Sequence, residues 1–302
     1  MGETVVVRPM SWQDTLGRGY TGQFFPAVGG GRRPAPLVII YYQCAGFLRG
    51  GLGDEWPLAS LARNGIAALC INAPPLQETA IERFEQGRLG IESAVDRLAS
   101  LGEVDPARVG LAGLSFGAEV AFWTAMNSQI ARVLSVSTPV ISPNLTLQLS
   151  LWEEVYLSRL RRYWQLGTPD ETPQGWQTLS PAFEPERVQV PVLMQMSEQE
   201  YRSSLDYAVP LIRMCRAEVY VFPNEPHQKY LPRHKLAVYE RNLDWFRFWL
   251  MGQESDGPAG TTRYARWRQI RRSSPHAPPL ADLAPETAAG SSSRTCTAGK
   301  HG

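Results

Sequence analysis

The sequence contains little cysteine and no long hydrophobic run. Its four cysteines (Cys44, Cys70, Cys215 and Cys296) are far apart and form no CxxC pair, which excludes a zinc ribbon and argues against a disulfide scaffold. No apolar run approaches the ~20 residues needed to cross a bilayer, so no membrane association is expected. The N-terminus lacks a basic region followed by an apolar secretion segment, and we therefore expect a cytoplasmic protein.

Neither sign of charge dominates the composition. The chain has 30 Lys and Arg against 29 Asp and Glu, whereas a dedicated nucleic-acid binder normally shows a basic surplus. Residues 29–31 are three glycines, but they lack the Lys-Ser/Thr of a phosphate-binding loop and precede a strand, so they predict a turn. We expect no nucleic-acid partner, no cofactor and no metal. With 302 residues, 43% of them hydrophobic, the chain is long enough for one large α/β domain.

Strand-like and helix-like segments alternate along most of the chain. Apolar runs bounded by turns predict buried strands, and apolar residues at helical spacing predict the helices between them. Strands separated by helices of this length imply a mostly parallel sheet with helices on both faces. The predicted strands are 36–42, 66–71, 108–112, 131–137, 188–196 and 218–222; the predicted helices are 56–63, 83–101, 116–126, 205–215 and 235–250.

Three regions depart from this alternation. Short β-like pieces flank the glycines at positions 17 and 19, so residues 1–26 predict an antiparallel hairpin at the sheet edge. Residues 144–167 predict an aromatic-rich helical insertion. Residues 273–302 are rich in Ala, Pro, Ser, Thr and Gly, and we expect a disordered tail after a domain that spans 1–272.

The most informative segment is a GxSxG pattern formed by Gly113, Ser115 and Gly117. This pattern is typical of a nucleophile elbow, in which a serine occupies a tight turn between a strand and a helix and small neighbours allow the two elements to approach. The pattern alone is weak, because the chain has 26 glycines. Its position after an apolar strand and before a helix strengthens it, so we predict that Ser115 is a nucleophile.

A serine nucleophile requires a histidine base and an acid, which in this architecture follow it in the order serine, acid, histidine. His227 lies in a loop just after the strand at 218–222 and is the preferred base; His234, at the start of the closing helix, suits a structural role. Glu198 follows the preceding strand directly and is the preferred acid. Glu200 is the second candidate, and Asp206 is expected one turn into a helix.

These residues resemble the catalytic domain of the prolyl oligopeptidase family of serine peptidases, and within it the lasso peptide isopeptidases. Residues 105–110, which lead into the elbow, are typical of the family. The more specific segments are 43–51, 53–55, 220–225, 239–250 and 264–268. The resemblance runs from about 11 to 272 and implies an α/β-hydrolase fold.

The sequence departs from that pattern in several places. The family places a β-propeller before this domain, and 302 residues leave no room for one, so the chain is either a catalytic domain alone or part of a longer reading frame. Glu198 stands where the family usually has Asp. Ala45 stands where the isopeptidases tend to carry Arg.

The resemblance also implies an oxyanion hole and a substrate grip. The position of the family's oxyanion tyrosine falls on Cys44, a weak donor, with Tyr42 two residues earlier. A backbone N–H in this loop, together with that of Phe116, is the alternative pair of donors. Arg49 and the aromatic residues of the insertion (Trp152, Tyr156, Tyr163 and Trp164) are candidates for holding substrate, although ordinary packing explains the aromatic residues equally well.

Together these features predict a serine hydrolase that transfers an acyl group from a peptide or isopeptide bond to water. If the isopeptidase resemblance holds, the partner is a threaded lasso peptide and the bond joins its N-terminal amine to an Asp or Glu side chain. Two alternatives stay open: a carboxylesterase, and a catalytically impaired α/β-hydrolase fold that acts as a binding module. The sequence predicts no oligomeric state.

Overall fold

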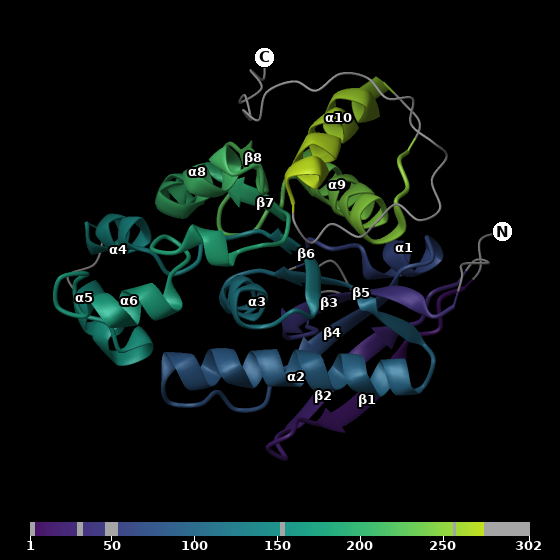
Figure 1. The fold of residues 1–302 in the computed structure, drawn as a ribbon, viewed down its shortest axis with the longest axis horizontal. Coiled ribbons are helices and arrows are strands. Elements are labelled where there is room, and N and C mark those ends of the chain that lie inside the picture. The colour runs from purple at the N-terminus through teal and green to yellow at the C-terminus, as the bar shows by residue number, and fades with distance from the viewer. Residues whose placement is uncertain (1–3, 29–32, 46–53, 152–154, 256–257, 275–302) are drawn as a thin grey trace.

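The computed structural model describes residues 4–28, 33–45, 54–151, 155–255 and 258–274 (Figure 1). Within them, eight strands form one sheet in the order β1-β2-β4-β3-β5-β6-β7-β8. All pairs are parallel except β1 with β2 and β2 with β4. The predicted α/β-hydrolase architecture is confirmed. The strands are β1 (Arg8–Gln13), β2 (Gly19–Phe25), β3 (Ala35–Tyr42), β4 (Ala67–Asn72), β5 (Val104–Gly113), β6 (Ala131–Val136), β7 (Val192–Ser197) and β8 (Ala217–Phe222).

The N-terminal hairpin forms the antiparallel edge of the sheet. Arg8 pairs with Phe24 and Gln13 with Gly19, so β1 and β2 lie side by side in the region where the sequence predicted a hairpin. The connecting turn contains Gly17 at φ 78°, a left-handed conformation that glycine adopts without steric cost. β2 then pairs with β4 and joins the hairpin to the parallel part of the sheet.

The centre of the sheet is apolar on both faces because helices cover both. Successive side chains of β3 point to opposite faces: Leu37 and Ile39 belong to one core cluster, and Val38 and Ile40 to the other. All four are fully buried. This explains why β3 reads in the sequence as a continuous apolar run rather than an alternating one.

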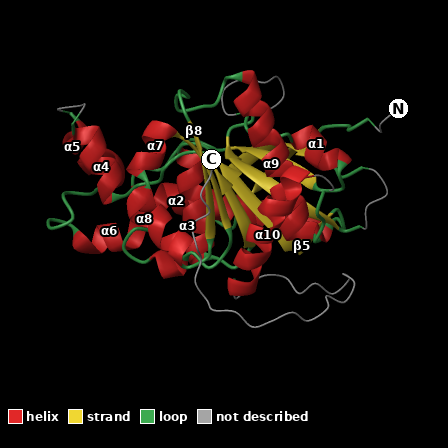
Figure 2. Ribbon diagram, turned by 90° about the horizontal axis from the view of Figure 1, so that it is seen from above, coloured by secondary structure: helices red, strands yellow, loops and turns green. Residues whose placement is uncertain are grey.

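Two groups of helices cover these faces. α2 (Ala80–Ser100) and α3 (Phe116–Asn127) contribute to one core cluster, whereas α1 (Leu58–Arg63), α9 (Pro232–Met251) and α10 (Pro258–Ser273) contribute to the other. Figure 2 shows the strands running between helices on the two sides. α10 was not predicted as a separate helix; it buries Tyr264 and Trp267 against α9. Residues 275–302, where the tail was predicted, lie outside the described residues.

The region between β6 and β7 contains the insertion, followed by one further helix and a short 3₁₀ turn. It consists of α4 (Pro143–Ser150), α5 (Tyr156–Arg159), a π-helical turn η1 (Leu160–Trp164) and α6 (Pro173–Leu179), followed by a short 3₁₀ turn η2 (Pro185–Arg187). After β7 come α7 (Glu198–Ser203) and α8 (Leu205–Arg213). The backbone N–H of Asn144 donates to the carboxylate of Asp206 at 2.8 Å, which ties α4 to α8. Among the described helices, none is both long and apolar enough to span a bilayer.

Candidate active site

Ser115 occupies the turn between β5 and α3, in a backbone conformation that few residues adopt. Its φ is 57° and its ψ is −129°, outside the regions favoured by residues with a side chain. Such a conformation costs about 1–3 kcal/mol and persists only where the surrounding structure enforces it. The elbow predicted from GxSxG is therefore present in the backbone geometry.

The two glycines of the pattern allow the elbow to pack this closely. A Cβ atom on Gly117 would lie 1.9 Å from the carbonyl oxygen of Tyr41, and a Cβ atom on Gly113 would lie 2.2 Å from the backbone of Gly117. Both distances are far below a van der Waals contact. Helix α3 therefore starts directly against β3 and β5, which holds Ser115 at the carboxyl edge of the sheet.

Hydrogen bonds from the neighbouring strand support the same turn. The backbone N–H of Ser115 donates to the hydroxyl of Thr138 at 2.7 Å. The N–H of Ser137 donates to the carbonyl oxygen of Gly113 at 3.2 Å. The end of β6 thus fixes both the nucleophile and the glycine before it.

Ser115 opens into a cavity of about 860 Å³ that reaches from the elbow to the insertion. Its walls come from the start of α3, the segment after β6, the insertion, α7 and the loop after β8. The lining residues are Ser115, Phe116, Glu119, Thr138, Pro139, Leu145, Gln148, Leu149, Tyr163, Trp164, Gln199, Glu200, Arg202, Ser203 and His227. In the part of the chain that the structure describes, no group of three or more His, Cys, Asp or Glu side chains could hold a metal ion.

His227 meets the carboxylate of Glu200 in this cavity. Its Nδ1 atom lies 2.5 Å from Oε1 of Glu200, and the hydroxyl of Ser197 approaches the other carboxylate oxygen at 3.3 Å. The hydrogen bond to Glu200 raises the pKa of His227, since the carboxylate stabilises the imidazolium form. With Nδ1 directed at Glu200, the Nε2 atom is the one left to exchange a proton with Ser115.

The preferred acid, Glu198, is not the residue that contacts His227. Its side chain is 46% exposed and forms an ion pair with Arg202 one turn later on α7. The reason is local: α7 begins immediately after β7, at Glu198, and two residues on a helix are about 200° apart, so Glu198 and Glu200 face opposite ways. The structure therefore corrects the prediction in favour of Glu200, the second candidate.

His234 has a structural position, as its place in the sequence suggested. Its Nδ1 atom lies 2.6 Å from the buried carboxylate of Glu225. That carboxylate also accepts the backbone N–H groups of Tyr230 and Leu231. His234 and Glu225 thus brace the loop that carries His227.

Phe116 fits its expected part in the oxyanion hole. It is the first residue of α3, and no group in the described residues accepts a hydrogen bond from its backbone N–H. Tyr42 packs edge-on against the Phe116 ring, with 5.3 Å between ring centroids, and is absent from the cavity lining. A role for the Tyr42 hydroxyl stays a prediction.

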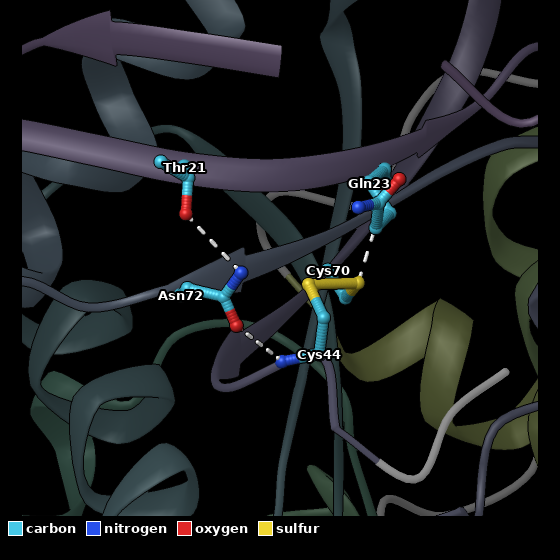
Figure 3. The surroundings of a disulfide bond; sticks show 5 residues. All are labelled: Thr21, Gln23, Cys44, Cys70 and Asn72. Atoms are coloured by element: carbon cyan, nitrogen blue, oxygen red, sulfur yellow. Dashed lines mark hydrogen bonds between the residues drawn. A yellow bond between two sulfur atoms is a disulfide. The ribbon is translucent and has the colours of Figure 1, made fainter. Parts of the chain in front are cut away.

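The expectation that Cys44 contributes to the oxyanion hole was wrong. Cys44 is bonded to Cys70, with 5.2 Å between their Cα atoms (Figure 3). The backbone N–H of Cys44 donates to the side chain of Asn72 at 2.7 Å. Neither its sulfur nor its N–H is therefore available to an oxyanion. The 26-residue separation hid this pairing, because the crossover through α1 brings β3 and β4 together.

The other predicted substrate contacts are only partly described. Arg49 and Trp152 lie outside the described residues. Tyr163 and Trp164 line the cavity, whereas Tyr156 is buried and is absent from its lining.

A buried carboxyl that the sequence reasoning missed, Glu119, also faces the cavity. It lies one turn after Ser115 on α3 and accepts a hydrogen bond from the indole N–H of Trp164 at 3.0 Å. Burial raises the pKa of Glu119 to about 7, because the low-dielectric surroundings penalise its charged form. The contact with Trp164 connects the nucleophile helix to the insertion.

A second missed feature is an ion pair beneath the site. Lys229 and Glu55 are both fully buried, with 3.2 Å between the ammonium nitrogen and a carboxylate oxygen. Lys229 also donates to the carbonyl oxygen of Ser137 at 3.0 Å and to its hydroxyl at 2.6 Å, and that hydroxyl contacts Glu55. The backbone N–H of Lys229 donates to Glu55 as well, at 3.0 Å. In the sequence, Lys229 stands two residues after His227 in the same loop, and nothing there marks it as buried.

We predict that breaking this pair destabilises the domain strongly. Lys229→Met leaves Glu55 buried without its counter-ion, and removing one partner of such a pair typically costs about 3–5 kcal/mol in the free energy of unfolding. Urea unfolding measures the loss. Replacing both residues, Glu55→Gln with Lys229→Met, is expected to recover part of it, because no unpaired charge remains.

A surface pair serves as the control for that measurement. Arg161→Met breaks the exposed pair with Glu171 and is expected to change the free energy of unfolding by less than about 1 kcal/mol. Equal losses for Lys229→Met and Arg161→Met would contradict the importance of the buried pair.

Comparisons with known proteins agree with this geometry. The prolyl oligopeptidase family matches residues 91–253. The lasso peptide isopeptidase AtxE2 of Asticcacaulis excentricus is 35% identical over 256 residues, which are 78% of this chain and 36% of AtxE2. The apo structure of AtxE2 superposes with a TM-score of 0.77 at 30% identity, covering 89% of this chain and 44% of that one.

A more distant structure shares the fold alone. The acylaminoacyl peptidase of Pyrococcus horikoshii matches with a TM-score of 0.61 at 18% identity, over 84% of this chain and 43% of that one. The chain thus spans less than half the length of these relatives. The family match over more than half of the sequence, on a fold whose elbow places Ser115 in a cavity that His227 and Glu200 also line, shows that this chain belongs to the prolyl oligopeptidase family.

Proposed function

We propose that this chain is the catalytic domain of a serine peptidase in which Ser115, His227 and Glu200 form the triad. The observation that carries the proposal is the 2.5 Å contact between Glu200 and Nδ1 of His227, in the cavity onto which the strained serine opens. An orienting acid at Nδ1 leaves Nε2 to act as the base, which is the arrangement that activates a serine hydroxyl. A fold that serves only as a binding module would not require it.

The first half of the reaction forms an acyl-enzyme. Nε2 of His227 takes the proton of Ser115 as its Oγ atom bonds to the carbonyl carbon of the substrate amide. The backbone N–H of Phe116 stabilises the resulting oxyanion, and one such donor is worth about 10²–10³ in rate. His227 then gives the proton to the leaving nitrogen as the C–N bond breaks, and the amine departs.

Water completes the cycle. His227 removes a proton from a water molecule while its oxygen attacks the acyl-enzyme, and the proton returns to Oγ of Ser115 as the ester bond breaks. Glu200 stays ionised throughout and stabilises the imidazolium form each time His227 is protonated. The net change is one amide and one water converted to one amine and one carboxylic acid.

The substrate class that we propose is a lasso peptide whose isopeptide bond is hydrolysed. Its support is the likeness to AtxE2, which is named a lasso peptide isopeptidase, and to a variant of AtxE2 solved with Astexin3-dC4 bound, at a TM-score of 0.75 and 30% identity. The cavity offers a peptide segment a volume of about 860 Å³ and an aromatic wall formed by Tyr163 and Trp164.

The cytoplasmic location proposed from the N-terminal residues stays a prediction. The disulfide between Cys44 and Cys70 bears on it, because disulfides persist mainly in oxidising compartments and are rare in the cytosol. The redox state of Cys44 and Cys70 in cells decides between a cytoplasmic location and an oxidising compartment.

The nucleophile is tested with a fluorophosphonate probe, which reacts with activated serines. We expect labelling of the wild type at Ser115, established by mass spectrometry of the labelled peptide, and none in Ser115→Ala. Ser128→Ala makes the same change outside the cavity and should label like the wild type. Labelling that survives Ser115→Ala, or that never occurs in the folded protein, would refute the proposal.

The acid is tested by a matched pair of substitutions on α7. Glu200→Gln keeps the size of the side chain but removes the charge at Nδ1 of His227, and kcat should fall at least about a hundredfold. Glu198→Gln removes a charge only two residues away, and kcat should stay within about twofold of the wild type. The reverse order of effects would return the role to Glu198.

The pH dependence of kcat/KM follows from the raised pKa of His227. The base works only when it is neutral, so kcat/KM should fall as the pH drops through the pKa of His227. This pKa lies above 6.5, the ordinary pKa of histidine. In Glu200→Gln the carboxylate no longer stabilises the imidazolium, so the remaining activity should keep its plateau to lower pH. Glu119 also changes its charge in the cavity near neutral pH. The comparison of wild type with Glu200→Gln is therefore repeated in proteins that carry Glu119→Gln, so that the titration of Glu119 does not contribute to the pH profile. An acid limb that does not move in Glu200→Gln would contradict the ion pair.

A further inference from the structure

A second, smaller cavity adjoins the active site on the side of the insertion. Its volume is about 450 Å³. Tyr163 and Trp164 line both cavities, so the two are neighbours across one aromatic wall. The described residues that line it are Glu78, Arg83, Arg159, Arg162, Tyr163 and Trp164. Arg159 already has an interaction partner, so two guanidinium groups, those of Arg83 and Arg162, stand against the one carboxylate of Glu78 and make this cavity basic.

Arg83 is the buried member of this set, with only 3% of its surface exposed. Its guanidinium group donates to the carbonyl oxygens of Glu78 at 2.7 Å and Gln77 at 3.4 Å, and to that of Tyr163. It also stacks on the Tyr163 ring, 3.9 Å from the centroid. Its Nε atom is buried without a hydrogen-bond partner.

The charge of Arg83 acts on the buried carboxyl of Glu119, where it opposes the rise in pKa that burial causes. It forms no direct salt bridge with an acid in the described residues, and Glu78 meets it through a backbone carbonyl only. Buried charges in proteins are normally paired, because neutral carbonyl groups compensate only part of the lost hydration. Arg83 also lies in the first turn of α2. The N-terminus of a helix disfavours a cation, so this position destabilises the positive charge further.

Arg162 supplies a second cation on the opposite wall. It is exposed and forms no ion pair within the described ranges, whereas its neighbour Arg161 is paired with Glu171 and does not line the cavity. The two adjacent arginines on this π-helical turn therefore differ: Arg161 is paired with Glu171, whereas Arg162 lines the cavity and has no salt bridge to a described residue.

We propose that this basic cavity is a substrate subsite that binds a carboxylate of the peptide whose amide bond lies at Ser115. A planar guanidinium fork matches a carboxylate in geometry and charge. The neighbouring active-site cavity indicates which anion binds here, because a peptide substrate there would extend past Trp164 into this cavity. The anionic groups of an unmodified peptide are carboxylates, either of an Asp or Glu side chain or of its C-terminus. The inference rests on the proposed function and specifies its substrate as an acidic peptide.

The test compares substrates before it compares variants. A threaded lasso peptide is assayed beside a form with an amidated C-terminus and a form whose acidic side chains outside the isopeptide bond are amides. The subsite predicts that one of these two changes raises KM by about tenfold, equivalent to about 1.4 kcal/mol, and the affected form identifies which carboxylate binds. Equal KM values for all three peptides would overturn the inference.

Variants then place the effect at the cavity. Arg162→Gln should raise KM for the unmodified peptide by about tenfold, and should not raise KM further for the amide form that has lost the bound carboxylate. Arg161→Gln, one residue away on the same turn, should leave both KM values unchanged. Arg83→Lys keeps the buried charge but loses the planar fork, and should also raise KM for the carboxylate substrate. A matching rise for Arg161→Gln would contradict the subsite, since it would indicate a general charge effect.

The two proposals fail differently. Fluorophosphonate labelling of Ser115 reports the nucleophile without any peptide, so its absence overturns the proposed function and the subsite with it. Normal labelling of Ser115, together with KM values that are the same with and without the carboxylates, overturns the subsite alone.

Discussion

The buried pair of Lys229 and Glu55 is the constraint on which the active-site geometry depends. Glu55 precedes α1, Ser137 ends the β6 region and Lys229 belongs to the loop after β8, so three segments distant in sequence meet at one charge network. Two unpaired charges could not remain there, because each would cost several kcal/mol of lost hydration. Each segment must therefore keep its place for the others to be stable.

This constraint acts on both halves of the triad. Ser137 lies next to Thr138, whose hydroxyl holds the backbone of Ser115, and Lys229 is two residues from His227. On the far side of the loop, the carboxylate of Glu225 gathers His234 and two backbone N–H groups. The segments that carry the proposed nucleophile and base are thus held by buried polar groups.

Sequence reasoning found the parts of the site that local pattern determines. Ser115 follows from two glycines whose absent Cβ atoms let α3 touch β3, and His227 follows from its place after a buried strand. The acid could not be decided in this way, because Glu198 and Glu200 both follow β7 and the choice depends on the residue at which α7 begins. A shift of that start by one or two residues would exchange their directions.

The features that were missed depend on contacts between distant segments. Cys44 and Cys70 meet because β3 and β4 are neighbours, and no spacing rule shows this in a chain with few cysteines. Lys229 reads as an ordinary loop residue until its burial beside Glu55 is known. A local sequence pattern shows what one helix, strand or turn requires. A disulfide or an ion pair between distant residues can be predicted only when the relative positions of two elements are known.

The insertion adds an aromatic wall to the hydrolase scaffold, and this wall lines both cavities. Trp164 donates to Glu119 on the nucleophile helix, and the backbone carbonyl of Tyr163 accepts from Arg83 at the start of α2. The π-helical turn that carries both aromatic residues is therefore anchored at two points, on either side of the wall that separates the two cavities. Because Glu119 and Arg83 are both buried charge-bearing groups, neither anchor can be released without leaving a polar group unpartnered. The wall is thus held at two points, although α4 and α5, which precede it, contribute few buried side chains.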